Sequence, residues 1–92
     1  MDQISAYALL ADKLNQWRAM PRNEVTSRVG APKVIEQVFI NGEPVSIEVT
    51  VNWVDSHRAR LLVTAVAYGP SHWKMERLQE RIILELVDVA KS

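Results

Sequence analysis

The chain contains no cysteine among its 92 residues, and this absence excludes several kinds of chemistry. A disulfide framework, a thiolate zinc site and a cysteine nucleophile all need a thiol group. Glycine is scarce as well: Gly30 fits the end of a helix, and Gly42 and Gly69 fit turns. A glycine-rich phosphate-binding loop needs several glycines close together, so the sequence does not contain one.

A surplus of charge of either sign is also missing, because eleven basic residues balance eleven acidic residues. A balanced chain has no long-range field to attract nucleic acid or anionic lipid, which argues against both as partners. No apolar run approaches the roughly 20 residues of a membrane-spanning helix. The first residues lack the basic and apolar regions of a secretory signal. We therefore expect a single domain, residues 1–92, located in the cytoplasm and without a membrane contact.

The clearest pattern that is present predicts a β-hairpin around Asn41-Gly42, a dipeptide that tolerates the positive φ angles of a type I′ turn. The second strand alternates between apolar residues (Val45, Ile47, Val49, Val51 and Trp53) and polar residues (Ser46, Glu48, Thr50 and Asn52). Such alternation is typical of a sheet with one buried face and one solvated face. A two-residue turn places Val38 opposite Val45. The same register places Val34 opposite Val49, whereas a three-residue loop would reverse the faces of the first strand.

Helical periodicity flanks the predicted strands. Apolar residues recur at spacings of three and four from Ile4 to Trp17 and again from Met75 to Val89. Pro21 and Pro32 bound a short helical segment between the first helix and the first strand. We predict helices at residues 2–19, 22–29 and 71–90, and strands at residues 33–40, 44–54 and 60–68. The fold class is α+β in the order α-α-β-β-β-α, a three-stranded antiparallel meander with its helices packed on one face.

No constellation of side chains predicts catalysis or metal binding. His57 has Asp55 and Ser56 as neighbours, but three consecutive residues of one loop do not assemble a nucleophile, a base and an orienting group, so we expect a solvated turn. His72 is expected to form a local cap or a stacking contact at the start of the last helix. Two histidines without thiolates make a poor metal site. We predict no catalytic residue, cofactor, metal ion or small-molecule ligand, and we do not expect an enzyme.

Glu36 is the one carboxylate on the predicted buried face, between Val34 and Val38. A buried carboxylate has a shifted pKa and is a candidate for function. The other interpretation, which we favour, places Glu36 at a sheet edge or beside an arginine.

Two predicted surfaces lack a partner within the chain. By strand alternation, one apolar group faces away from the helices, and the last helix carries an apolar arc wider than one flat sheet covers. The interface candidates are Phe39, Leu62, Val66, Tyr68, Ile83, Leu84 and Val87. Apolar patches with polar rims mark protein partners, although scattered surface apolarity is an equal alternative. We predict a protein-interaction or assembly module, with self-association as a homodimer.

The order helix, three strands, helix resembles the double-stranded-RNA-binding domain, which implies weak nucleic-acid binding as an alternative function. That family contacts RNA through a lysine cluster that opens the last helix and through a Gly-Pro-x-His loop. Here acidic residues interrupt the cations of the last helix, and the Asn41–Pro44 turn carries no histidine. The cations available to such a function are Arg58, Arg60, Lys74, Arg77 and Arg81. The resemblance therefore concerns architecture alone.

A second resemblance rests on Val29-Gly30-Ala31-Pro32, on the hairpin from Gly42 to Trp53 and on the segment from Gly69 to Trp73. These motifs resemble a family of small bacterial proteins with a leading helix, V-G-x-P, an I-E-V-x-V-x-W hairpin and Gly-x-x-Trp. The resemblance implies no activity. Those proteins continue past the tryptophan with an extended F-I-V segment, whereas this chain continues with the amphipathic pattern described above.

Overall fold

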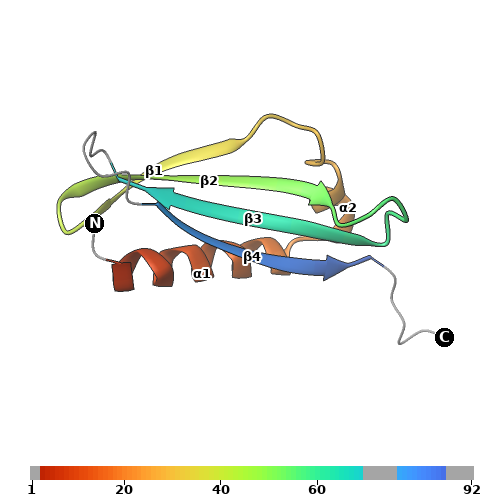
Figure 1. Cartoon of the computed structure of the whole chain (residues 1–92), viewed down its shortest axis with the longest axis horizontal. Helices are drawn as coiled ribbons and strands as arrows, with labels where there is room; N and C mark the ends of the chain where they lie inside the picture. The colour runs from red at the N-terminus through yellow and green to blue at the C-terminus, as the bar shows by residue number, and fades with distance from the viewer. Residues whose placement is uncertain (1–2, 70–76, 87–92) are drawn as a thin grey trace.

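The computed structural model describes residues 3–69 and 77–86, which form two helices and four strands. In chain order these are α1 (Gln3–Ala19), α2 (Arg22–Thr26), β1 (Val34–Ile40), β2 (Glu43–Trp53), β3 (Arg60–Tyr68) and β4 (Arg77–Glu85). The strands form one antiparallel sheet in the order β1-β2-β3-β4, and α1 lies along one side of it (Figure 1). The predicted α+β class and antiparallel meander are confirmed, but the sheet has a fourth strand.

The fourth strand replaces part of the predicted last helix, so the prediction of a helix over residues 71–90 is wrong at residues 77–85. β4 pairs with β3 along its whole length, with Leu84 opposite Leu61 and Ile83 opposite Leu62. The sequence of β4 suits both structures, because Leu78 and Ile82 have helical spacing and also share a strand face. Pairing with the free edge of β3 outweighs the helix propensity of its Glu, Arg and Leu residues. The rest of the predicted helix, with Val87, lies outside the described residues.

The hairpin of β1 and β2 has the predicted register. Val38 lies opposite Val45, and Val34 lies opposite Val49. The turn residues Asn41-Gly42 have φ angles of 52° and 79°, as a type I′ turn requires. This turn fixes which side chains of β1 face α1 and which face away.

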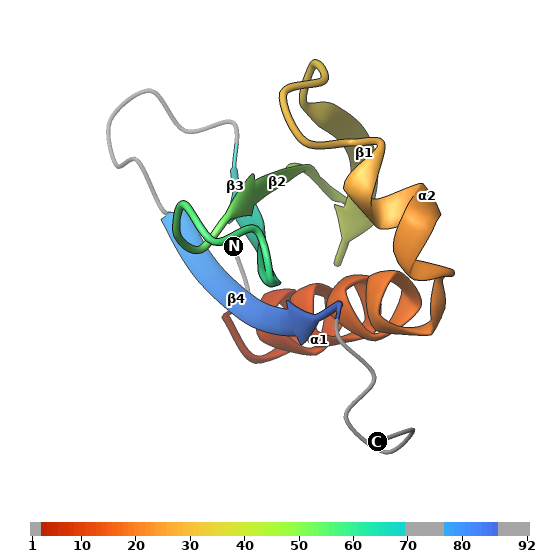
Figure 2. The same ribbon diagram turned by 90° about the vertical axis from the view of Figure 1, so that its right-hand side faces the viewer.

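The core lies between α1 and the inner face of the sheet. α1 contributes Ala6, Leu10, Leu14 and Trp17, and the strands contribute Ile40, Val45, Ile47, Val49, Val51, Leu61, Val63, Ala65, Ala67, Leu78 and Leu84. Val25 of α2 is fully buried and closes one end. α1 packs chiefly on β3 and β4. Figure 2 shows β4 beside α1, with β1 on the far side of the curved sheet.

Candidate functional site

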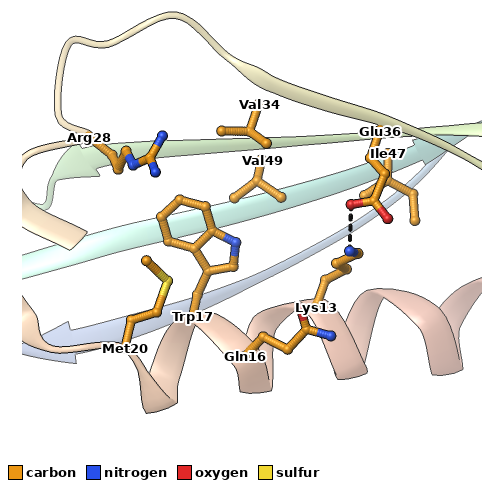
Figure 3. A pocket seen from close by; sticks show the side chains of 9 residues that line it. All are labelled: Lys13, Gln16, Trp17, Met20, Arg28, Val34, Glu36, Ile47 and Val49. Atoms are coloured by element: carbon orange, nitrogen blue, oxygen red, sulfur yellow. Dashed lines mark hydrogen bonds and ion pairs between the residues drawn. The ribbon is translucent and has the colours of Figure 1, made fainter. Parts of the chain in front are cut away.

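A groove lies between the C-terminal half of α1 and the inner face of β1 and β2, on the side of the sheet that α1 covers least (Figure 3). It encloses about 360 Å³. Its lining combines four charged or polar side chains with five apolar ones: Lys13, Gln16, Arg28 and Glu36, and Trp17, Met20, Val34, Ile47 and Val49. The residues come from α1 and the residue after it, from β1 and β2, and from the turn after α2, so the fold alone brings them together.

The indole of Trp17 forms one wall of this groove. It projects from α1 toward Val34 and Val49 on the facing strands (Figure 3). Trp17 is itself largely buried, at 8% exposure, so the surrounding core fixes its ring. One side of the groove is therefore a rigid apolar surface formed by the indole, and the β-sheet forms the opposite side.

The positive and negative charges of the side chains around the groove do not balance. The ammonium group of Lys13 forms an ion pair with the carboxylate of Glu36 (Figure 3). Arg28, whose guanidinium lies toward Trp17, pairs with no carboxylate among residues 3–69 and 77–86. Once Lys13 and Glu36 neutralise each other, one positive charge remains at the groove.

The position of Glu36 decides between the two interpretations of this residue, a buried carboxylate or a paired carboxylate at a sheet edge. It faces the helix side and lies on an edge strand, as predicted, but its partner is a lysine and its side chain is 47% exposed. The buried-carboxylate alternative is therefore wrong.

The other face of the sheet, which we call the open face, lies away from α1. The register places Leu62, Val66 and Tyr68 opposite Asn52, Glu48 and Ser46 on this face. Phe39 lies on it as well, opposite Pro44, so the predicted placement of all four candidates is confirmed. Ile83 joins them because it lies opposite Leu62. Leu84 does not: it points into the core and is 3% exposed, so its prediction as an interface residue is wrong.

The open-face candidates do not form one continuous exposed patch. Val66 is buried by its neighbours, and Leu62 and Tyr68 are half-buried. The strongly exposed apolar side chains lie at the margins, with Phe39 and Ile35 on β1 and Ile83 on β4. Ile35 was not among the candidates, although strand alternation placed it on the same face as Phe39. On the open face, the exposed apolar surface is therefore concentrated at the β1 edge.

The centre of the open face holds a polar contact. The hydroxyl of Tyr68 donates a hydrogen bond to the carboxylate of Glu48 at 3.2 Å. Partial burial and the adjacent Glu48 carboxylate raise the pKa of Tyr68 above its ordinary value of 10.0. This contact gives the middle of the face a polar character.

Of the two histidines, His57 lies in the described part of the chain. His57 lies exposed in the turn between β2 and β3, where its backbone N–H donates to Asp55, as expected of a solvated turn. His72 and Lys74 lie outside the described residues. Among residues 3–69 and 77–86, no group of three or more histidine or carboxylate side chains is placed to hold a metal ion. No helix in this part of the chain is long and apolar enough to cross a membrane.

No family model, curated protein or solved structure matches the chain.

Proposed function

We propose that the protein is a small assembly module that forms a homodimer through the outer edge of β1. β1 is an edge strand, and no strand in the described part of the chain pairs with its outer side. It forms the upper margin of the sheet, opposite the side occupied by α1 (Figure 1). An edge strand presents a row of backbone N–H and C=O groups that can pair with another chain. The observation that carries the proposal is the self-complementary sequence of this strand.

Two antiparallel copies of β1 pair favourably when the two-fold axis that relates them passes through Gln37. Antiparallel pairing in a continuous sheet sets residues of the same face opposite each other. Gln37 then opposes Gln37 of the second copy, and Ile35 opposes Phe39. All seven residues of β1 pair without an overhang, since Val34 opposes Ile40. The two most exposed apolar side chains of the open face, Phe39 at 73% and Ile35 at 58%, thereby gain apolar neighbours.

The backbone of β1 supports the same register. In an antiparallel ladder, the backbone N–H and C=O groups of successive residues point alternately toward the partner strand and away from it. Counting from the two-residue turn, the groups of Ile35, Gln37 and Phe39 point away from β2, to the outer side. The register centred on Gln37 sets these three residues opposite one another. Every outward backbone group of the strand therefore has a partner.

Neighbouring registers are less favourable. Centring the pair on Glu36 sets two carboxylates opposite each other, which destabilises a cross-strand pair. Centring it on Val38 sets Gln37 opposite Phe39 and leaves the start of β1 unpaired. In the proposed register Glu36 opposes Val38 and keeps its ion pair with Lys13.

The opposite edge is a poorer site for self-pairing. β4 has Arg81 at its centre, so a full-length match of two copies sets arginine against arginine. The guanidinium of Arg22 also donates to the carbonyl of Glu85 at the end of this strand, at 3.4 Å. The β1 edge carries neither obstacle.

Sedimentation velocity over roughly 1 to 500 µM protein tests the proposal, because a dimer fraction must rise with concentration. We expect Phe39→Lys to raise the dimer dissociation constant by about tenfold or more, because each dimer contains two Ile35–Phe39 pairs. Ile83→Lys is the matched control: it removes an exposed apolar side chain of the same face on β4. A strict monomer throughout, or equal effects of the two variants, would overturn the proposal.

A proline variant adds a test of the backbone. Gln37→Pro removes an outward N–H, which an edge strand tolerates on its solvent side. We expect a folded monomer by circular dichroism and sedimentation. Dimerisation at the wild-type level would contradict pairing through β1.

A further inference from the structure

The groove beside Trp17 has the composition of a binding site for a small organic anion, and this inference is independent of the dimer. All of its lining residues belong to one chain. Its volume of about 360 Å³ lies within the range of small-molecule sites, which is about 300–1,000 Å³. Such sites combine an apolar lining with a small number of placed polar groups.

The apolar part of the groove fits a ligand whose hydrophobic group is a flat ring or a branched aliphatic chain. The indole of Trp17 faces Val34 and Val49 across the groove (Figure 3). An aromatic ring stacks on an indole in an offset arrangement, and a branched aliphatic group packs on the same surface. The sheet and the core hold these side chains in place, so a ligand does not have to order them.

The polar part of the groove selects for negative charge. Lys13 is neutralised by Glu36, and Gln16 donates to Asp12 at 3.2 Å. Arg28 remains without a carboxylate partner in the described part of the chain, and it lines the same groove as Trp17 (Figure 3). A guanidinium binds a carboxylate through two parallel hydrogen bonds, which fixes both charge and orientation.

We propose that the groove binds a small carboxylate with an aromatic or branched apolar body. The body lies against Trp17, and the carboxylate accepts hydrogen bonds from Arg28. Lys13 and Glu36 bound the opposite end and add no net charge. The site therefore discriminates between a carboxylate and its uncharged amide, which have nearly the same shape.

A titration with 2-naphthoate, followed by ¹⁵N-resolved NMR, tests this site. We expect the indole signal of Trp17 and the backbone signals of Val34 and Val49 to shift together and to saturate. The neutral analogue 2-naphthamide is expected to bind about tenfold more weakly, because it cannot form the charge-assisted pair. Absence of these shifts at millimolar ligand, or equal affinity for the two compounds, would overturn the proposal.

Substitution of the cation separates charge selection from apolar packing. Arg28→Gln keeps a polar, uncharged side chain at an exposed position, so the fold is expected to survive. We expect it to weaken 2-naphthoate binding about tenfold and to leave 2-naphthamide binding unchanged. Arg81→Gln on β4 is the control and should leave both affinities unchanged. If Arg28→Gln binds 2-naphthoate like the wild type, the assignment of Arg28 is wrong.

Discussion

Lys13 of α1 and Glu36 of β1 form an ion pair that joins the helix to an edge strand which α1 otherwise covers little. The lysine side chain is 17% exposed and the glutamate side chain 47% exposed, so solvent screens the pair only in part. This contact anchors the middle of β1 to the layer beneath it.

A double-mutant cycle with Lys13→Met and Glu36→Gln measures this contact. We expect a coupling free energy of about 0.5–1 kcal/mol, typical of a partly exposed ion pair, and a smaller value at high salt. The measurement is urea unfolding of the two single variants and the double variant. Lys33→Met is the control, since Lys33 forms no described ion pair. A coupling energy near zero at low salt would contradict the anchoring role.

Adjacent residues of β4 should differ sharply in their effect on stability. Leu84 is 3% exposed and packs in the core, whereas Ile83 is 53% exposed on the open face. We expect Leu84→Ala to lower the free energy of unfolding by about 2–5 kcal/mol and Ile83→Ala by about 0.5 kcal/mol or less. Denaturant unfolding of both variants checks this. Similar losses for the two substitutions would argue against strand alternation in β4.

The hydrogen bond between Tyr68 and Glu48 predicts a dependence of stability on alkaline pH. Because the folded-state pKa of Tyr68 is raised above 10.0, the neutral phenol is favoured on folding. The resulting stability is fully present below pH 10.0 and is lost as the pH rises through the folded pKa. We expect the free energy of unfolding to fall less steeply in Tyr68→Phe than in the wild type over a pH series across this range. An equal fall in the two proteins would contradict a stabilising role for this contact.

The turn that sets the β1 register depends on Gly42. Its φ angle is 79°, and apart from the glycine itself and its two chain neighbours no atom of the described residues lies within 4 Å of the position that a Cβ would occupy. The cost of an added side chain is therefore conformational rather than steric. We expect Gly42→Ala to destabilise the fold by about 1–2 kcal/mol in thermal unfolding. Gly42→Asn should cost less, because asparagine tolerates this region. Equal losses would indicate a different turn geometry.

The hairpin could be predicted from the sequence because its determinants are local. Asn41-Gly42 selects a two-residue turn, and that turn fixes every pair of β1 and β2 by counting outward. The placement of Phe39 on the open face follows from the same count. The predicted strand at residues 60–68 matches β3 in both bounds, because Gly69-Pro70 ends its apolar run.

β4 could not be predicted from its own sequence, because its structure depends on a neighbour. β3 pairs with β2 on one edge and with β4 on the other, whereas its apolar pattern indicates burial of its faces and does not show that the second edge has a partner. One local indication was available: at helical spacing Leu84 lies away from the apolar arc that contains Leu78 and Ile82, whereas strand alternation places it in the core. The groove was missed for a similar reason, since Trp17, Arg28 and Val49 are far apart in sequence and meet through topology.

The peripheral position of β1 has a consequence for aggregation. Among the described strands β1 has a single neighbour, so it can separate from the sheet without disturbing the pairing of β3 with β2 and β4. Its sequence V-I-E-Q-V-F-I is rich in β-forming residues, contains one charge and has neither proline nor glycine. Short segments of this kind are the ones that nucleate amyloid when exposed. The proposed register closes after two copies, so in that dimer the outer edge of β1 would be occupied and could not add a third copy to an open-ended fibre.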